Sequence, residues 1–177
     1  MKYILKKQHV LSFLFFVFLA IGIFATPASQ TFAATTGSVT ATVMTQNVSL
    51  SVTDGSINYG TLNANTAKST ITADLNDLQT ATNDGNVAED FNIKGQNSAG
   101  WTLAATAGSN QYVHKFCTAT CSTPPTNFSA LTTSYLPLAV NKLALATQTF
   151  DLQITTPNPS TVYTQQSVDV TVQAVIH

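Results

Sequence analysis

The chain has 177 residues, a formal net charge of −1 and charged side chains at only 8% of its positions. It contains no arginine, and beyond residue 33 it carries four lysines and eight acidic residues, a net charge of 4 − 8 = −4. This charge argues against nucleic acids and anionic membrane surfaces as partners, because both attract basic patches.

The first 33 residues have the three parts of a secretory signal peptide. Three lysines precede an uncharged apolar run from Val10 to Phe24, and small residues follow that run. Signal peptidase requires small side chains just before the cut, so we expect cleavage after Ala33, with Ala28 as the alternative. The apolar run of 15 residues is shorter than the roughly 20 that cross a bilayer, which disfavours a retained anchor helix. We therefore expect a secreted protein, extracellular or at the cell surface, with no membrane span after cleavage.

Residues 34–177 predict a single all-β domain. Threonine is the most frequent residue there, and its branched Cβ favours strands, as that of valine and isoleucine does. Apolar and polar residues alternate repeatedly, first at residues 39–43 and 48–52 and last at residues 168–174. Asp54-Gly55 marks a turn, and Asp84-Gly85 is typical of a hairpin. About nine or ten short strands at this spacing are typical of an antiparallel β-sandwich or jelly roll.

The apolar positions of these strands predict the hydrophobic core. Trp101 is interpreted first as a core residue, since a lone tryptophan on a strand usually fills space between sheets, and an exposed binding platform is the alternative. Residues 76–86 form a polar stretch, and residues 136–146, LPLAVNKLALA, are the one place where a short helix fits. The predicted core is Leu50, Val52, Phe91, Ile93, Trp101, Leu103, Phe150, Leu152, Val170 and Val172.

Two cysteines, Cys117 and Cys121, lie in the segment FCTATCS. In an exported chain such a pair is usually a disulfide, here one that closes a tight turn. The alternative is a metal site that adds His114 and His177, but no second Cys-x-x-Cys or His-x-x-x-His unit accompanies it. We therefore predict a Cys117–Cys121 disulfide and no metal.

Catalytic motifs are missing from residues 34–177. There is no His-Glu-x-x-His and no Gly-x-Ser-x-Gly, and Glu89 and Asp90 would point to opposite faces of a strand. The acidic residues between Asp74 and Asp84 allow a weak Ca²⁺ site, although turn formation is the preferred interpretation. We therefore expect a non-enzymatic protein without a cofactor.

Two segments resemble known surface-protein families. GWTLAATAG, with Trp101 and Leu103, resembles the first Trp-x-Leu signature of WxL domains, which bind peptidoglycan non-covalently; the final strand, VDVTVQAVI, has no second tryptophan. NYGTL followed by TNDGNVAEDFNIKG resembles the camelysin/TasA-like matrix proteins. The second resemblance implies a signal peptide leading directly into one sandwich, in a group where some members form extracellular fibres.

These observations lead to two functional hypotheses. The first is a self-associating subunit of an extracellular matrix or fibre, in which the alternating segment ATTGSVTATVMTQNVSLSV of one copy pairs with a sheet edge of another. Charged side chains, which would protect such edges from pairing, are scarce in this sequence. The second is a cell-wall module in which Trp101 and Leu103 contact glycan, as the WxL resemblance implies.

Overall fold

The computed structural model describes residues 36–121 and 127–177. The chain divides into two units, Met1–Val43 and Met44–His177, and each is described by itself. In the first unit, residues 36–43 are exposed and form no helix or strand. The strand prediction for residues 39–43 is therefore wrong, because these residues pair with no strand in the part of the chain that the structure describes. The predicted signal peptide and its cleavage site lie outside the described residues.

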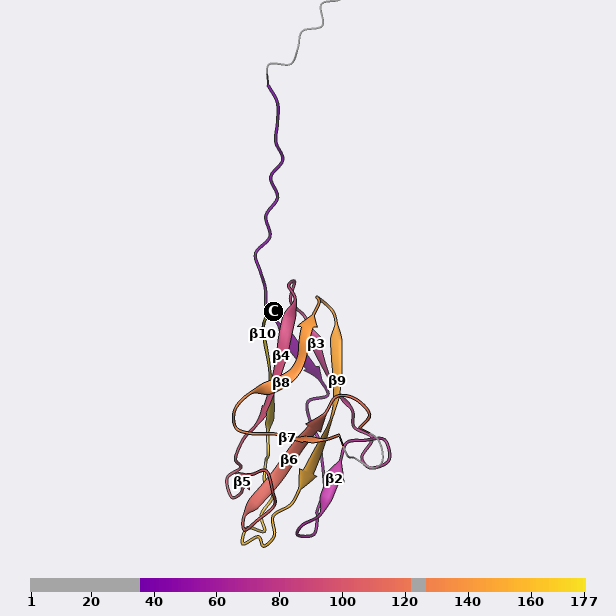
Figure 1. Ribbon diagram of the computed structural model, residues 1–177, viewed down its shortest axis with the longest axis vertical. Coiled ribbons are helices and arrows are strands. Elements are labelled where there is room, and N and C mark those ends of the chain that lie inside the picture. Colours follow the sequence, from indigo (N-terminus) through magenta and orange to yellow (C-terminus); the bar gives the residue numbers. More distant parts are fainter. Residues whose placement is uncertain (1–35, 122–126) are drawn as a thin grey trace, which may run out of the picture. The chain divides into compact units, whose positions relative to one another are not determined.

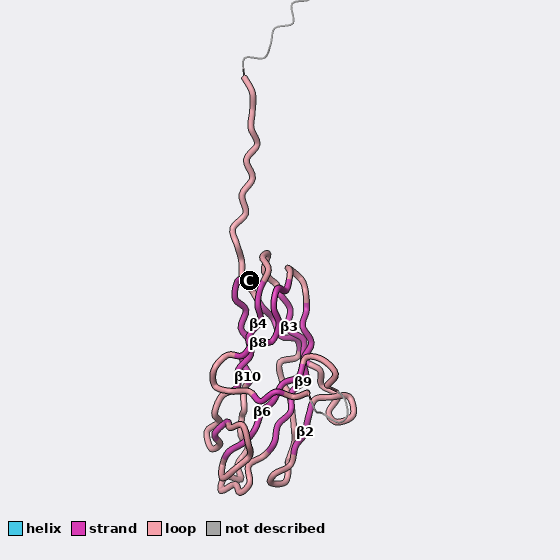
Figure 2. Tube along the Cα trace, viewed as in Figure 1, coloured by secondary structure: helices cyan, strands magenta, loops and turns pink. Residues whose placement is uncertain are grey.

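The second unit is built from β-strands, and no helix occurs in the residues that the structure describes (Figures 1 and 2). This confirms the all-β prediction and the expected number of strands. The ten strands are β1 (Leu50–Thr53), β2 (Ala67–Ser69), β3 (Gln79–Asn83), β4 (Glu89–Gly95), β5 (Thr102–Leu103), β6 (Gln111–Cys117), β7 (Ser129–Ala130), β8 (Leu136–Lys142), β9 (Thr147–Thr155) and β10 (Val170–Ile176).

The strands form two sheets. The first has seven strands in the order β1-β3-β9-β6-β5, with β2 added to β9 and β7 added to β6; the second has three in the order β10-β4-β8. β9 organises the first sheet because its first half pairs with β3, while its second half pairs with β6 on one side and β2 on the other. All pairings are antiparallel except that of β5 with β6.

The two sheets share one apolar core. Ala81, Phe150 and Leu152 from the seven-stranded sheet form a single buried cluster with Phe91, Ile93 and Leu138 from the three-stranded sheet. Such a cluster requires the sheets to pack face to face, as in a sandwich. Of the predicted core, Phe91, Ile93, Phe150 and Leu152 are buried, and five more residues are half-buried against the cluster: Leu50, Val52, Leu103, Val170 and Val172.

Two local predictions were wrong, and one strand was not predicted. Residues 136–142 form strand β8 rather than a helix, because they pair with β4 across an irregular register. The polar stretch 76–86 contains β3, a strand between β1 and β9 whose buried positions include the polar residues Gln79 and Asn83. Asp84-Gly85 does not close a hairpin, because β3 and β4 belong to different sheets and this segment crosses between them.

Candidate functional site

Within the second unit, the segment that leads into β1 is held by hydrogen bonds around Asn86. The Asn47 N–H donates to Asn86 Oδ1 (2.7 Å), the Asn86 N–H donates to the Asn47 carbonyl (3.0 Å), and Asn86 Nδ2 donates to the Thr45 carbonyl (2.8 Å). The asparagine thus pairs with the backbone of residues 45–47 as a neighbouring strand would. Residues 45–49 are therefore fixed at the β3–β4 crossing.

Glu89 holds the next residue of this segment. Its side chain is fully buried, and Oε1 accepts a hydrogen bond from the Ser49 N–H (3.0 Å). The second oxygen, Oε2, is buried without a hydrogen-bond partner among the described residues. Its neighbour Asp90 faces the other side of β4 and is bonded to His177 Nδ1 (2.8 Å), which confirms that the two carboxylates do not share a site.

The strands at one side of the core have open edges. β1 and β10 are the end strands of their sheets, and each pairs on one side only. Their core-facing side chains are half-buried rather than buried, unlike those of the central strands β3, β4 and β9. These residues are Leu50 and Val52 on β1, and Val170, Val172 and Ala174 on β10. Among the described residues, the outer backbone groups of β1 and β10 are thus not paired in a sheet, which is the feature that an added strand would use.

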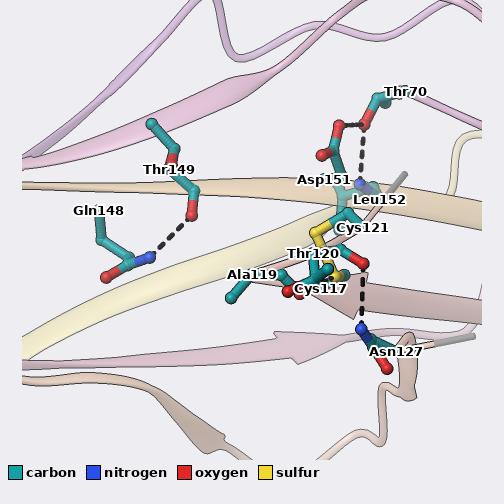
Figure 3. Close-up of a disulfide and its surroundings, with 10 residues drawn as sticks. All are labelled: Thr70, Cys117, Ala119, Thr120, Cys121, Asn127, Gln148, Thr149, Asp151 and Leu152. Carbon is teal, nitrogen blue, oxygen red and sulfur yellow. Dashed lines mark hydrogen bonds between the residues drawn. A yellow bond between two sulfur atoms is a disulfide. The ribbon is translucent and has the colours of Figure 1, made fainter. Parts of the chain in front are cut away.

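The predicted disulfide is present. Cys117, at the end of β6, and Cys121 are bonded, and their Cα atoms are 5.7 Å apart (Figure 3). The turn lies beside β9, where Asp151 Oδ1 accepts from Thr70 Oγ1 (2.8 Å). An open depression of about 520 Å³ next to the turn is lined by both apolar and polar residues, among them Ile71, Thr149 and Asp151. The structure therefore gives the cysteines a structural role.

The residues considered for metal binding are bonded elsewhere. His114 Nε2 lies 3.2 Å from the Tyr59 hydroxyl, and His177 is bonded to Asp90. In the acidic loop, Asp74 Oδ2 accepts from the Ser69 N–H (2.6 Å), and Asp77 Oδ1 accepts from Gln79 Nε2 (2.8 Å). The described residues contain no group of three or more His, Cys, Asp or Glu side chains able to hold a metal ion.

Trp101 lies outside the main core cluster and is half-buried. Its indole Nε1 donates to Ser160 Oγ (3.2 Å), and its ring lies 6.2 Å from that of Tyr112. Leu103, by contrast, packs against the core. The two residues of the Trp-x-Leu motif thus have different surroundings, and glycan contact through them stays a prediction.

The contact of His114 with Tyr59 is one of the buried polar contacts that sequence reasoning missed. His114 on β6 is only 2% exposed and meets Tyr59, a residue 55 positions earlier, from the segment between β1 and β2. Burial lowers the pKa of His114 from 6.5 to about 4, so the imidazole is neutral near pH 7. Burial, together with the charges of Asp77, Asp74 and Asp151, raises the pKa of Tyr59 above its ordinary value. The alternation Tyr112–His114–Phe116 was the one signal that placed His114 on a strand.

Comparisons of the chain with protein-family models, with curated proteins and with solved structures give no match. Function is therefore inferred from the geometry of this chain alone.

Proposed function

We propose that the protein is a secreted, non-enzymatic structural subunit of an extracellular matrix or fibre, and that copies join by strand addition. The observation that carries the proposal is the state of residues 36–43. They alternate between small or polar residues and apolar ones, yet Val39 and Val43 are 96% and 98% exposed and belong to no sheet. A segment with strand chemistry and no partner strand fits a role in pairing with another copy.

The open edges supply a suitable acceptor. An added strand makes main-chain hydrogen bonds to an edge such as β10 or β1, and alternate side chains enter the space beside the core. The half-buried residues at these edges, such as Val172 and Val52, are apolar, as are Val39, Ala41 and Val43 of the donated segment. Burial of that apolar surface on both partners supplies the favourable free energy.

The disulfide and the signal-peptide pattern support the extracellular part of the proposal. Disulfides persist in oxidising compartments, and the Cys117–Cys121 bond is consistent with one. The signal-peptide pattern of residues 1–33 points the same way. The domain is proposed as a two-sheet sandwich with exposed edges, and the jelly-roll strand order remains an expectation.

The test is a pair of matched double variants of the protein that begins at Ala34. Val39→Lys/Val43→Lys places charges on the side chains that strand pairing would bury, whereas Thr40→Lys/Thr42→Lys adds the same charge on the opposite face. We expect size-exclusion chromatography and electron microscopy to show assemblies for the starting protein and for the threonine variant, and monomers for the valine variant. Monomers at every concentration for the starting protein, or equal assembly of both variants, would refute strand addition.

A further inference from the structure

The connection between β1 and β2 lies over the first sheet with few attachments. Residues 56–65, here called the strap, form no helix or strand, and Gly60 has a positive φ of 71°. Ile57 packs against the core cluster. The strap is attached at both ends: Ser56 Oγ donates to Asp54 Oδ1 (3.4 Å), the Asn63 carbonyl accepts from Thr156 Oγ1 (2.6 Å), and the Asn65 N–H donates to the Pro157 carbonyl (3.3 Å). Between these ends, the Tyr59–His114 contact is the one hydrogen bond among the described residues that joins residues 57–62 to the rest of the domain. The middle of the strap is thus pinned by one phenol and one imidazole.

The second nitrogen of that imidazole has no partner. His114 Nδ1 is buried and makes no hydrogen bond to any residue that the structure describes. Burying an unprotonated ring nitrogen without a donor costs less free energy than burying an N–H without an acceptor. We therefore assign the proton of the neutral ring to Nε2, where the N–H donates to the Tyr59 oxygen. A second proton must then go to Nδ1, where it would be a buried cationic N–H with no acceptor.

The charged groups near the contact do not meet this need. The charges of Asp74, Asp77 and Asp151 raise the pKa of Tyr59, but none of these carboxylates is bonded to His114 Nδ1. They accept hydrogen bonds from Ser69, Gln79 and Thr70 respectively. Lys68 is opposite Ile154 in the strand register, and Ile154 is opposite His114, so Lys68 belongs to the same row of side chains. The positive charge of Lys68 in that row disfavours a second positive charge on His114. The neighbouring side chains of Tyr59 and Tyr112 carry no negative charge that would compensate it.

We propose that the Tyr59–His114 contact is an acid-labile latch, and that proton uptake on His114 Nδ1 releases the strap from the sheet. In the released state the imidazolium reaches water, and the strap leaves Ile57, Tyr59 and the β6 face beneath them accessible. The latch is independent of strand addition by residues 36–43. It gives the domain two states, closed near neutral pH and open in acid.

The direction of the pH dependence follows from the two protonation equilibria. The closed state holds His114 with a pKa of about 4, whereas in the open state the pKa returns to 6.5. Closure is therefore fully favoured above pH 6.5, weakens as the pH falls from 6.5 to 4, and changes no further through this group below pH 4. The equilibrium constant for opening rises by up to tenfold for each pH unit between these values. Opening is therefore about 300-fold more favourable below pH 4 than above pH 6.5.

Hydroxyl-radical footprinting between pH 7 and pH 3.5, read by mass spectrometry, tests the latch because it measures how far side chains such as Ile57 and Tyr59 are protected from solvent. We expect residues 56–62 to lose protection as the pH falls, while β4 keeps its protection. His114→Gln removes the titration but retains an amide able to bond Tyr59, so the strap of this variant should stay protected. His177→Gln is the matched control, because it removes the other histidine beyond residue 33 and should leave the acid response unchanged.

Two results would overturn the latch: a strap whose protection does not depend on pH, or a His114→Gln variant that loses protection over the same pH range. If that variant does not fold, NMR titration of the His114 ring in the His177→Gln protein decides the question. Protonation of His114 at the pH where the strap side chains lose protection supports the latch. Protonation without any loss of strap protection refutes it.

Discussion

Gly85 is the residue at which the β3–β4 crossing tolerates no side chain. A Cβ added there would lie 2.3 Å from the Asn47 carbonyl oxygen, 2.4 Å from Glu89 Oε1 and 3.1 Å from Asn83 Oδ1. The absence of a side chain thus lets the segment entering β1 approach β4 closely enough for the Ser49–Glu89 hydrogen bond.

We expect Gly85→Ala to lower the free energy of unfolding by about 1–3 kcal/mol, the usual effect of overpacking a close contact. Urea unfolding followed by tryptophan fluorescence measures the change. Gly37→Ala is the control, since nothing lies within 4 Å of a Cβ at that position. Equal stability of the two variants would show that the crossing relaxes without cost.

Trp101 offers a test that separates a structural role from glycan contact. Its ring is half-buried and its indole N–H is bonded to Ser160. We expect Trp101→Ala to lower the free energy of unfolding by about 2 kcal/mol, less than for a fully buried ring, and Trp101→Phe to cost about 1 kcal/mol for the lost hydrogen bond. Thermal unfolding measures both. Loss of peptidoglycan pull-down in Trp101→Ala with unchanged stability would instead favour the wall-binding hypothesis.

At the scale of elements, strands with apolar inward positions were predictable from alternation, and the others were not. β4, β9 and β10 alternate clearly, because Phe91, Leu152 and Val172 and their neighbours face the core. β3 was missed because two of its buried positions, Gln79 and Asn83, are polar, and some of their partners lie far away in the sequence, such as the Lys142 carbonyl 59 residues from Asn83. Pairing over such distances leaves no local pattern.

The candidate site was predictable to a similar extent. The unpaired alternation at residues 36–43 is visible in the sequence, and so is the cysteine pair. The Tyr59–His114 contact is not, because Tyr59 lies in a segment without regular structure and the contact spans 55 positions. The Asn86 and Glu89 hydrogen bonds to residues 45–49 likewise depend on the crossing between the sheets.

The Cys117–Cys121 turn should contribute modestly to stability. The two cysteines are separated by only four positions, so the closed loop is small and its closure entropy corresponds to about 2 kcal/mol. We expect a reducing agent to lower the midpoint of thermal unfolding by about 5 °C, measured by circular dichroism at neutral pH. The Cys117→Ser/Cys121→Ser protein should unfold at the lower temperature with or without the reductant. An effect of reductant on that double variant would show that the bond is not the cause.

At the scale of the whole molecule, the distribution of charge predicts what holds the proposed assembly together. From Val10 to Thr53 the sequence has no aspartate, glutamate, lysine or arginine, so the donated segment 36–43 and the strand that follows it are uncharged. The acceptor edge on β10 is also poor in charge, with Asp169 just before it. Strand addition here relies on main-chain hydrogen bonds and apolar burial, which salt screens little.

We therefore expect self-association to change little between 50 and 500 mM sodium chloride, concentrations that bracket the range in which charge pairs are screened. Light scattering at fixed protein concentration, with size-exclusion chromatography in the same buffers, measures the assembled fraction. Sodium sulfate at equal ionic strength is the informative comparison: sulfate strengthens apolar burial, so assembly should increase. Dissociation by sodium chloride would mean that charged side chains outside residues 36–43, such as the lysines of the second unit, form the interface. Strand addition would then not be what joins the copies.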